Sequence, residues 1–160
     1  MKDSITLSSI DEDIHFEPVD SPFEFGIRRI EEACDKIGFD PDAGVVTSKD
    51  AIAQKLKAML AGIKTPEGFH KWMLPLSLPG AHFFMSIGEP MASVPPHSHD
   101  HGAGIRFIVA GSIIYNNTEL TSGDWMYVPK GVKYSFVVGH NGVTLASGYY
   151  SCCNGGGAGD

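Results

Sequence analysis

The feature that most constrains this chain is a change of hydrophobic pattern at Trp72. From there to about residue 150, short runs rich in β-branched and aromatic residues are broken every few positions by Pro or Gly. Such runs favour antiparallel strands joined by tight turns. A tight turn is predicted at Asn116-Asn117, because Asn tolerates a positive φ. The predicted strands are 73–77, 81–88, 93–99, 104–110, 112–116, 124–128, 133–138 and 142–150.

The residues before Trp72 have the pattern of two helices. A capping box from Ser21 to Glu24 starts the first, and Gly38 provides a left-handed stop. Its apolar stripe is formed by Ile27, Ile30, Cys34 and Ile37. The second helix is predicted to begin at Thr47 or Ser48. Its apolar face is formed by Ile52, Leu56, Met59, Leu60 and Ile63. Both stripes are expected to pack on the β unit.

Length and charge limit the class of protein. The 160 residues suffice for one domain with an extension, which predicts an arm and two helices over 1–71, a barrel over 72–153 and a flexible Gly-rich tail over 154–160. An excess of 19 acidic over 12 basic residues, with no basic cluster, argues against nucleic acid or a membrane as partner and favours a small molecule. Without a signal-peptide pattern or an apolar run of ~20 residues, the chain is expected to be soluble and cytoplasmic.

The cysteines and histidines are the side chains of this chain most suited to binding a metal ion. Three cysteines cannot form a disulfide framework, and adjacent Cys152 and Cys153 are expected to be free thiols. His97 and His99 lie two positions apart on a predicted strand, so their side chains point to the same face. Their α-carbons are about 7 Å apart, which allows both imidazoles to bind one ion. His101 lies about 13 Å from His97 in an extended strand and can join them only if the chain bends.

Two segments resemble the motifs of the cupin family. Pro95 to Gly111 is similar to the first motif, and Gly123 to Tyr134 to the second, with its G(x)5PxG frame intact. The resemblance covers about residues 72–150 and implies an all-β cupin double-stranded β-helix, or jelly-roll barrel, with an N-terminal helical extension. It also implies a homodimer. Family members usually complete their metal site with a Glu and a second-motif His, whose positions are Gly104 and Tyr134 here.

The candidate site residues follow from these motifs, and each has an alternative. His97, His99 and His101 are the candidate metal ligands, for Fe(II) foremost and otherwise Mn, Ni or Zn; alternatively, His97 and His99 are hydrogen-bonded barrel histidines. Tyr134 is a ligand, a proton donor or base, or a core residue. Arg106 shares the inward parity of position 104, so its guanidinium is expected to be buried. Its partner is either a ligand carboxylate or an internal carboxylate of Glu89, Glu119 or Asp124, unless it faces solvent.

Three functions are consistent with this set. The leading hypothesis is a small metal-dependent cupin enzyme, a non-haem iron dioxygenase acting on a small acidic or carbonyl-bearing molecule. In it, Tyr134 and Arg106 are the catalytic residues: Arg106 orients an anionic group and Tyr134 handles a proton. The alternatives are a lyase or isomerase with Tyr134 as base, and a non-catalytic small-molecule-binding or sensor cupin. The incomplete ligand set favours the last, because two histidines hold a metal loosely.

Overall fold

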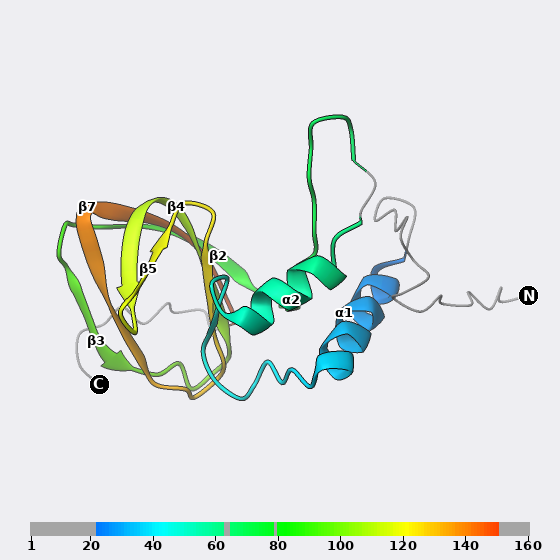
Figure 1. The fold of residues 1–160 in the computed structure, drawn as a ribbon. Helices are drawn as coiled ribbons and strands as arrows, with labels where there is room; N and C mark the ends of the chain where they lie inside the picture. Colours follow the sequence, from blue (N-terminus) through cyan, green and yellow to red (C-terminus); the bar gives the residue numbers. More distant parts are fainter. Residues whose placement is uncertain (1–21, 63–64, 79, 151–160) are drawn as a thin grey trace, which may run out of the picture. The chain divides into compact units, whose positions relative to one another are not determined.

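The computed structural model of the chain describes residues 22–62, 65–78 and 80–150 (Figure 1). They divide into a helical unit, the described parts of Met1–Asp40 and Ala51–Ser77, and a β unit, the described parts of Pro41–Asp50 and Leu78–Asp160. The predictions for the N-terminal arm, Ser21, Ile63, the vicinal cysteines and the Gly-rich tail lie outside the described residues. Among the described helices, none is long and apolar enough to cross a membrane.

The helical unit contains α1 (Phe23–Ile37) and α2 (Ala51–Met59). Gly38 ends α1 in the left-handed conformation, at φ 68°, as predicted. The apolar stripes of the two helices meet in one cluster, whose buried members are Ala33, Cys34, Leu56 and Leu60. The predicted start of the second helix at Thr47 or Ser48 is wrong. Thr47 is extended and pairs with Met126, while its backbone N–H donates to the Asp50 carboxylate over 2.7 Å, so the helix begins at Ala51.

The β unit contains seven strands, all paired antiparallel. They are β1 (Val46–Thr47), β2 (His82–Gly88), β3 (Ser93–His97), β4 (Gly104–Tyr115), β5 (Thr118–Thr121), β6 (Trp125–Val128) and β7 (Tyr134–Tyr149). The first half of β4 and the second half of β7 lie at the centre of the order β1-β6-β4-β7-β2. The second half of β4 pairs with β5, and the first half of β7 pairs with β3. The two long strands β4 and β7 therefore belong both to the part of the barrel with β1, β6 and β2 and to the part with β3 and β5 (Figure 1).

The strand pattern confirms the predicted all-β class but corrects several boundaries. Residues 73–77 form no strand, and β1 and β5 were not predicted. Two predicted breaks between strands are absent. The strands predicted at 104–110 and 112–116 form the single strand β4, and those predicted at 133–138 and 142–150 form the single strand β7. At Gly111, φ is 73° and an added Cβ would lie 2.0 Å from the carbonyl oxygen of Gly142, so only glycine allows the paired strands β4 and β7 to approach so closely there.

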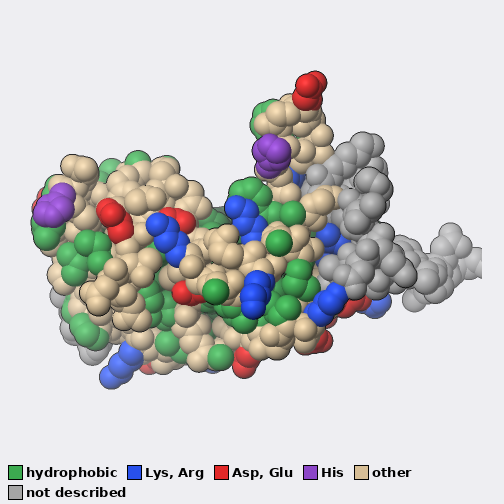
Figure 2. Space-filling model, in the orientation of Figure 1, with side chains coloured by type: hydrophobic (Ala, Val, Ile, Leu, Met, Phe, Trp, Pro, Cys, Tyr) green, Lys and Arg blue, Asp and Glu red, His purple; other side chains and the backbone are tan. Residues whose placement is uncertain are grey.

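The hydrophobic core of the β unit lies between the two parts of the barrel. Its buried members are Ile108, Ile113, Leu120, Met126, Val128, Tyr134, Phe136, Val138, Val143 and Leu145. The predicted turn between β4 and β5 is confirmed, with φ of 49° at Asn116 and 60° at Asn117. On the surface, the face shown in Figure 2 carries basic and acidic side chains interspersed rather than in single-sign patches.

Candidate functional site

Antiparallel pairing gathers five polar or aromatic side chains inside the β unit. His97 at the end of β3 pairs with Tyr134 at the start of β7. Gly104 at the start of β4 pairs with Tyr149 at the end of β7. This pairing places the side chain of Arg106, two positions after Gly104, beside the Tyr149 ring. We call His97, His99, Arg106, Tyr134 and Tyr149 the barrel cluster. All except His97, which is partly exposed, are buried.

The rings of the barrel cluster are in direct contact. The ring centroids of His97 and Tyr134 lie 4.5 Å apart, and those of His97 and His99 lie 5.1 Å apart. The His99 ring lies 5.1 Å from that of Tyr149 and 5.8 Å from that of Tyr134. These separations are typical of aromatic rings in contact, so the side chains of the cluster pack directly against each other.

Arg106 is a buried cation without a carboxylate partner. Its side chain is only 5% exposed, as strand alternation predicts. Its guanidinium carbon lies 4.7 Å from the ring centroid of Tyr134 and 5.2 Å from that of Tyr149, which are cation–π distances. Nη2 donates a hydrogen bond to the Tyr134 hydroxyl, whereas Nη1 has no hydrogen-bond partner among the residues that the structure describes.

The internal ion pair considered for Arg106 is not formed. Asp124 instead accepts a hydrogen bond from Ser48 over 2.8 Å and lies 3.6 Å from the Lys49 amine. Across the part of the chain that the structure describes, neither Glu89 nor Glu119 makes an ion pair with the guanidinium. Within the described part of the chain, the partners of the Arg106 guanidinium are therefore aromatic rings and one hydroxyl.

Burial fixes the protonation states around Arg106. It raises the pKa of Tyr134 to about 12, although the Arg106 charge acts in the opposite direction. Burial, then the Arg106 charge, lowers the pKa of His99 to about 4. Both groups are thus neutral near pH 7. The Tyr134 hydroxyl accepts a hydrogen bond from Arg106 and lies 2.9 Å from Nε2 of His99, where the tautomer of the neutral imidazole decides which of the two groups donates.

Tyr149 is the member of the cluster that sequence reasoning missed. A Cβ at Gly104 would lie 2.4 Å from Cε1 of Tyr149, so this ring occupies the space of any side chain at position 104. Its hydroxyl is buried; Ser147 and Tyr134 lie close enough to affect its pKa, but neither makes a hydrogen bond of normal geometry with it. The available signal was Gly104 itself, because a glycine inside a strand indicates close approach of another group.

The donor set does not fit a resident transition metal. Among the described residues, no group of three His, Cys, Asp or Glu side chains lies close enough to hold an ion. Nδ1 of His97 lies 2.9 Å from the Pro95 carbonyl oxygen, and Nε2 of His99 is bonded to Tyr134. His101, the third candidate ligand, is exposed, and so is His82 at the start of β2, a further histidine considered as a ligand. A buried guanidinium also opposes a second cation, and no carboxylate of the described residues pairs with it.

The lowered pKa of His99 predicts a loss of stability in acid. Its ordinary pKa is 6.5, and in the folded protein it is about 4, so between these values only the unfolded chain binds the proton. We therefore expect the free energy of unfolding to be highest above pH 6.5 and to fall by roughly 2 kcal/mol as the pH is lowered to 4. Urea denaturation across this range measures it. His99→Gln should remove much of the decline and exposed His140→Gln should not; equal slopes in the two variants would contradict this account.

Comparisons with known proteins give likeness of fold only. No family model and no curated protein matches the chain. An RmlC-like cupin from Shewanella frigidimarina is 22% identical over 44% of this chain and 65% of its own, with a TM-score of 0.40. A protein of unknown function with a cupin-like fold from Ralstonia eutropha is 18% identical over 45% of this chain and 48% of its own, with a TM-score of 0.40.

A cupin protein from Bacteroides fragilis is 22% identical over 54% of this chain and 75% of its own, with a TM-score of 0.39. This chain spans less than two thirds of the length of the Shewanella and Ralstonia proteins. All three are described as cupins or as cupin-like, which is the fold that the two sequence motifs resemble. At these identities and TM-scores, no activity is transferred from them to this chain.

Proposed function

We propose that the cupin-like β unit binds a small molecule carrying a carboxylate, with Arg106 as its anchor, and that it serves as a binding or sensor module. The observation that carries the proposal is the buried guanidinium with an unpartnered Nη1. A buried charge without a counter-ion is costly, so such a group is retained where a ligand supplies the opposite charge. A carboxylate is the partner that matches the guanidinium fork.

Tyr149 and Tyr134 support a specific mode of binding. The Tyr149 hydroxyl is a second buried polar group that makes no hydrogen bond of normal geometry with the described residues, and its ring lies over the guanidinium. One carboxylate can accept from Nη1 of Arg106 and from this hydroxyl together, which satisfies both groups. The Tyr134 hydroxyl accepts a hydrogen bond from Nη2, the other terminal nitrogen of the guanidinium. This hydrogen bond orients the guanidinium before the ligand binds.

The same contacts favour binding over catalysis. A hydroxyl whose pKa is raised to about 12 is a hydrogen-bond donor near neutral pH and a poor base, so the lyase or isomerase with Tyr134 as base is less well supported. The iron dioxygenase stays a prediction. It requires at least one further ligand besides His97 and His99, and the described residues offer none in the cluster.

Matched pairs of acids and amides test the proposal. Benzoate and benzamide have nearly the same shape and differ in charge, and acetate and acetamide form a smaller pair. Titration calorimetry on the full chain should detect binding of at least one acid, with its amide at least about 10-fold weaker, because only the acid neutralises Arg106. Equal binding of acid and amide, or binding of neither pair, would contradict the proposal.

A further inference from the structure

His97 is the member of the barrel cluster that is partly exposed, and it lies close to the buried guanidinium. The Tyr134 ring centroid lies 4.5 Å from that of His97 and 4.7 Å from the guanidinium carbon of Arg106. No more than one ring therefore separates the imidazole from the guanidinium. A small molecule that reaches Arg106 from the end of β3 passes His97 on its way.

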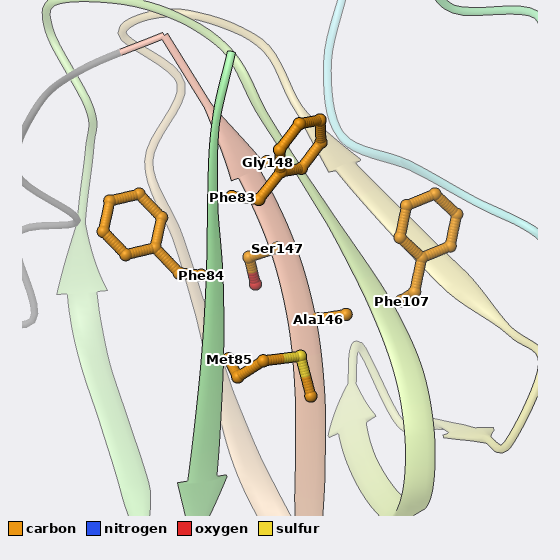
Figure 3. A pocket seen from close by; sticks show the side chains of 7 residues that line it. All are labelled: Phe83, Phe84, Met85, Phe107, Ala146, Ser147 and Gly148. Carbon is orange, nitrogen blue, oxygen red and sulfur yellow. The ribbon is translucent and has the colours of Figure 1, made fainter.

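Aromatic rings cover other sides of the guanidinium. The Phe136 ring lies 5.6 Å from the guanidinium carbon, and the Phe84 ring of β2 packs against that of Tyr149, with the centroids 5.9 Å apart. Figure 3 shows Phe84 on the opposite side of β2 from Phe83. The hollow in this view opens between Phe83 and Phe107, whose side chains are on the exposed face of the sheet (Figure 3). The atoms of a ligand beyond its carboxylate are therefore expected to lie toward the end of β3.

His97 has one hydrogen-bonding atom that the described residues leave without a partner. Its Nδ1 lies 2.9 Å from the carbonyl oxygen of Pro95, and because a carbonyl oxygen only accepts, Nδ1 carries the proton of the neutral ring. Nε2 is then an acceptor, and it has no hydrogen-bond partner in the part of the chain that the structure describes. The cluster thus offers a cationic donor at Arg106 and a neutral acceptor at His97.

We propose that the carboxylate ligand of Arg106 is a small hydroxy acid, whose hydroxyl donates a hydrogen bond to Nε2 of His97. This inference rests on the proposed function, because it specifies the ligand that Arg106 binds. One molecule can accept from Nη1 of Arg106 with its carboxylate and donate to His97 with its hydroxyl. An ammonium group in place of the hydroxyl would bring a second positive charge close to the buried guanidinium, which disfavours amino acids.

Titration calorimetry of the full chain with matched acids tests the proposal. Glycolate differs from acetate by one hydroxyl, and lactate and 3-hydroxypropionate each differ in the same way from propionate. At least one hydroxy acid should bind about 3- to 10-fold more tightly than its parent acid, which is the effect of one added hydrogen bond. Its methyl ether, which has no hydrogen to donate, should lose this advantage. The matching amino acid should bind more weakly than the hydroxy acid.

His97→Phe identifies the acceptor. Phe keeps a ring against Tyr134 but has no acceptor atom, so the hydroxy acid and its parent should bind this variant within about 2-fold of each other. The affinity for the parent acid should stay close to the wild-type value, because Arg106 is unchanged. His101→Phe is the matched control, since His101 is exposed in the same motif segment, and it should keep the preference for the hydroxy acid. Circular dichroism checks that both variants fold.

The possible failures of this inference and of the proposed function can be told apart. Equal binding of every hydroxy acid and its parent by the wild-type chain would overturn the hydroxy-acid inference and leave carboxylate binding by Arg106 intact. A preference that survives in the methyl ether, or in folded His97→Phe, would have the same consequence. If none of the acids binds, the inference falls together with the proposed function.

Discussion

Arg106→Met is expected to weaken binding of the acid identified by calorimetry by about 2 to 5 kcal/mol, because the ligand carboxylate would lose its only cationic partner in the barrel. The free energy of unfolding of the ligand-free protein should change by less than about 1 kcal/mol. The reason is that Arg106 forms no ion pair with any described residue, so none of their carboxylates loses a partner when it is removed. Calorimetry and urea denaturation measure the two quantities separately.

A control variant and the pKa of His99 provide two further tests of the role of Arg106. Arg28→Met removes an exposed arginine of α1 and should leave ligand binding unchanged. In the Arg106→Met protein, the pKa of His99 should rise from about 4 while staying below its usual value, because burial, the larger cause of the shift, remains. A loss of roughly 3 to 5 kcal/mol in the stability of ligand-free Arg106→Met would show a structural charge instead, and would end the carboxylate proposal.

Gly104→Glu restores the residue type that the cupin resemblance implies at this position, and it is expected to destabilise the fold by at least about 3 kcal/mol. The new Cβ alone would lie 2.4 Å from the Tyr149 ring, and the longer side chain adds further overlap. Gly148→Ala is the matched control, since a Cβ there meets its nearest atoms at 3.6 Å, an ordinary contact distance. Urea denaturation at one protein concentration compares them.

The double variant Gly104→Glu/Tyr149→Ala tests whether the Tyr149 ring is what blocks a metal site. It should be more stable than the sum of the two single changes predicts, by roughly 1 to 3 kcal/mol, because the new side chain takes the space of the ring. It should also retain Zn²⁺ after desalting where the wild-type protein retains little, since His97 and His99 gain a carboxylate. A Gly104→Glu protein as stable as the wild type would contradict the position of the Tyr149 ring.

Several parts of the site could be predicted from local pattern. Alternation along a strand places Arg106 on the inner face, and its side chain is buried. The two motif segments put His97, His99 and Tyr134 within one cluster, since the turns around them return the strands to the barrel. These features depend on the period of a strand and on turn chemistry, both of which are encoded within a few consecutive residues.

Other parts could not be predicted because they depend on residues far apart in the chain. The helix expected from Thr47 begins later, since Val46 and Thr47 pair with residues 126 and 127. The strands expected to end at residues 110 and 138 continue, because Gly111 and Gly142 both adopt a positive φ and their backbones lie in close contact. Local propensity gives way to tertiary pairing in both cases.

The sequence by itself determined the strand periodicity, the two motifs, the loss of the usual Glu and His, and the inward charge at Arg106. Only the tertiary structure decided what surrounds that charge. Tyr149 lies 45 positions beyond Gly104 in the chain and reaches it through the pairing of β4 with β7. Among the described residues no carboxylate pairs with Arg106, and β2 is an edge strand with exposed apolar side chains. The alternation of side chains along a strand determines the face of the sheet to which each one points, whereas the order of the strands determines which residues it contacts there.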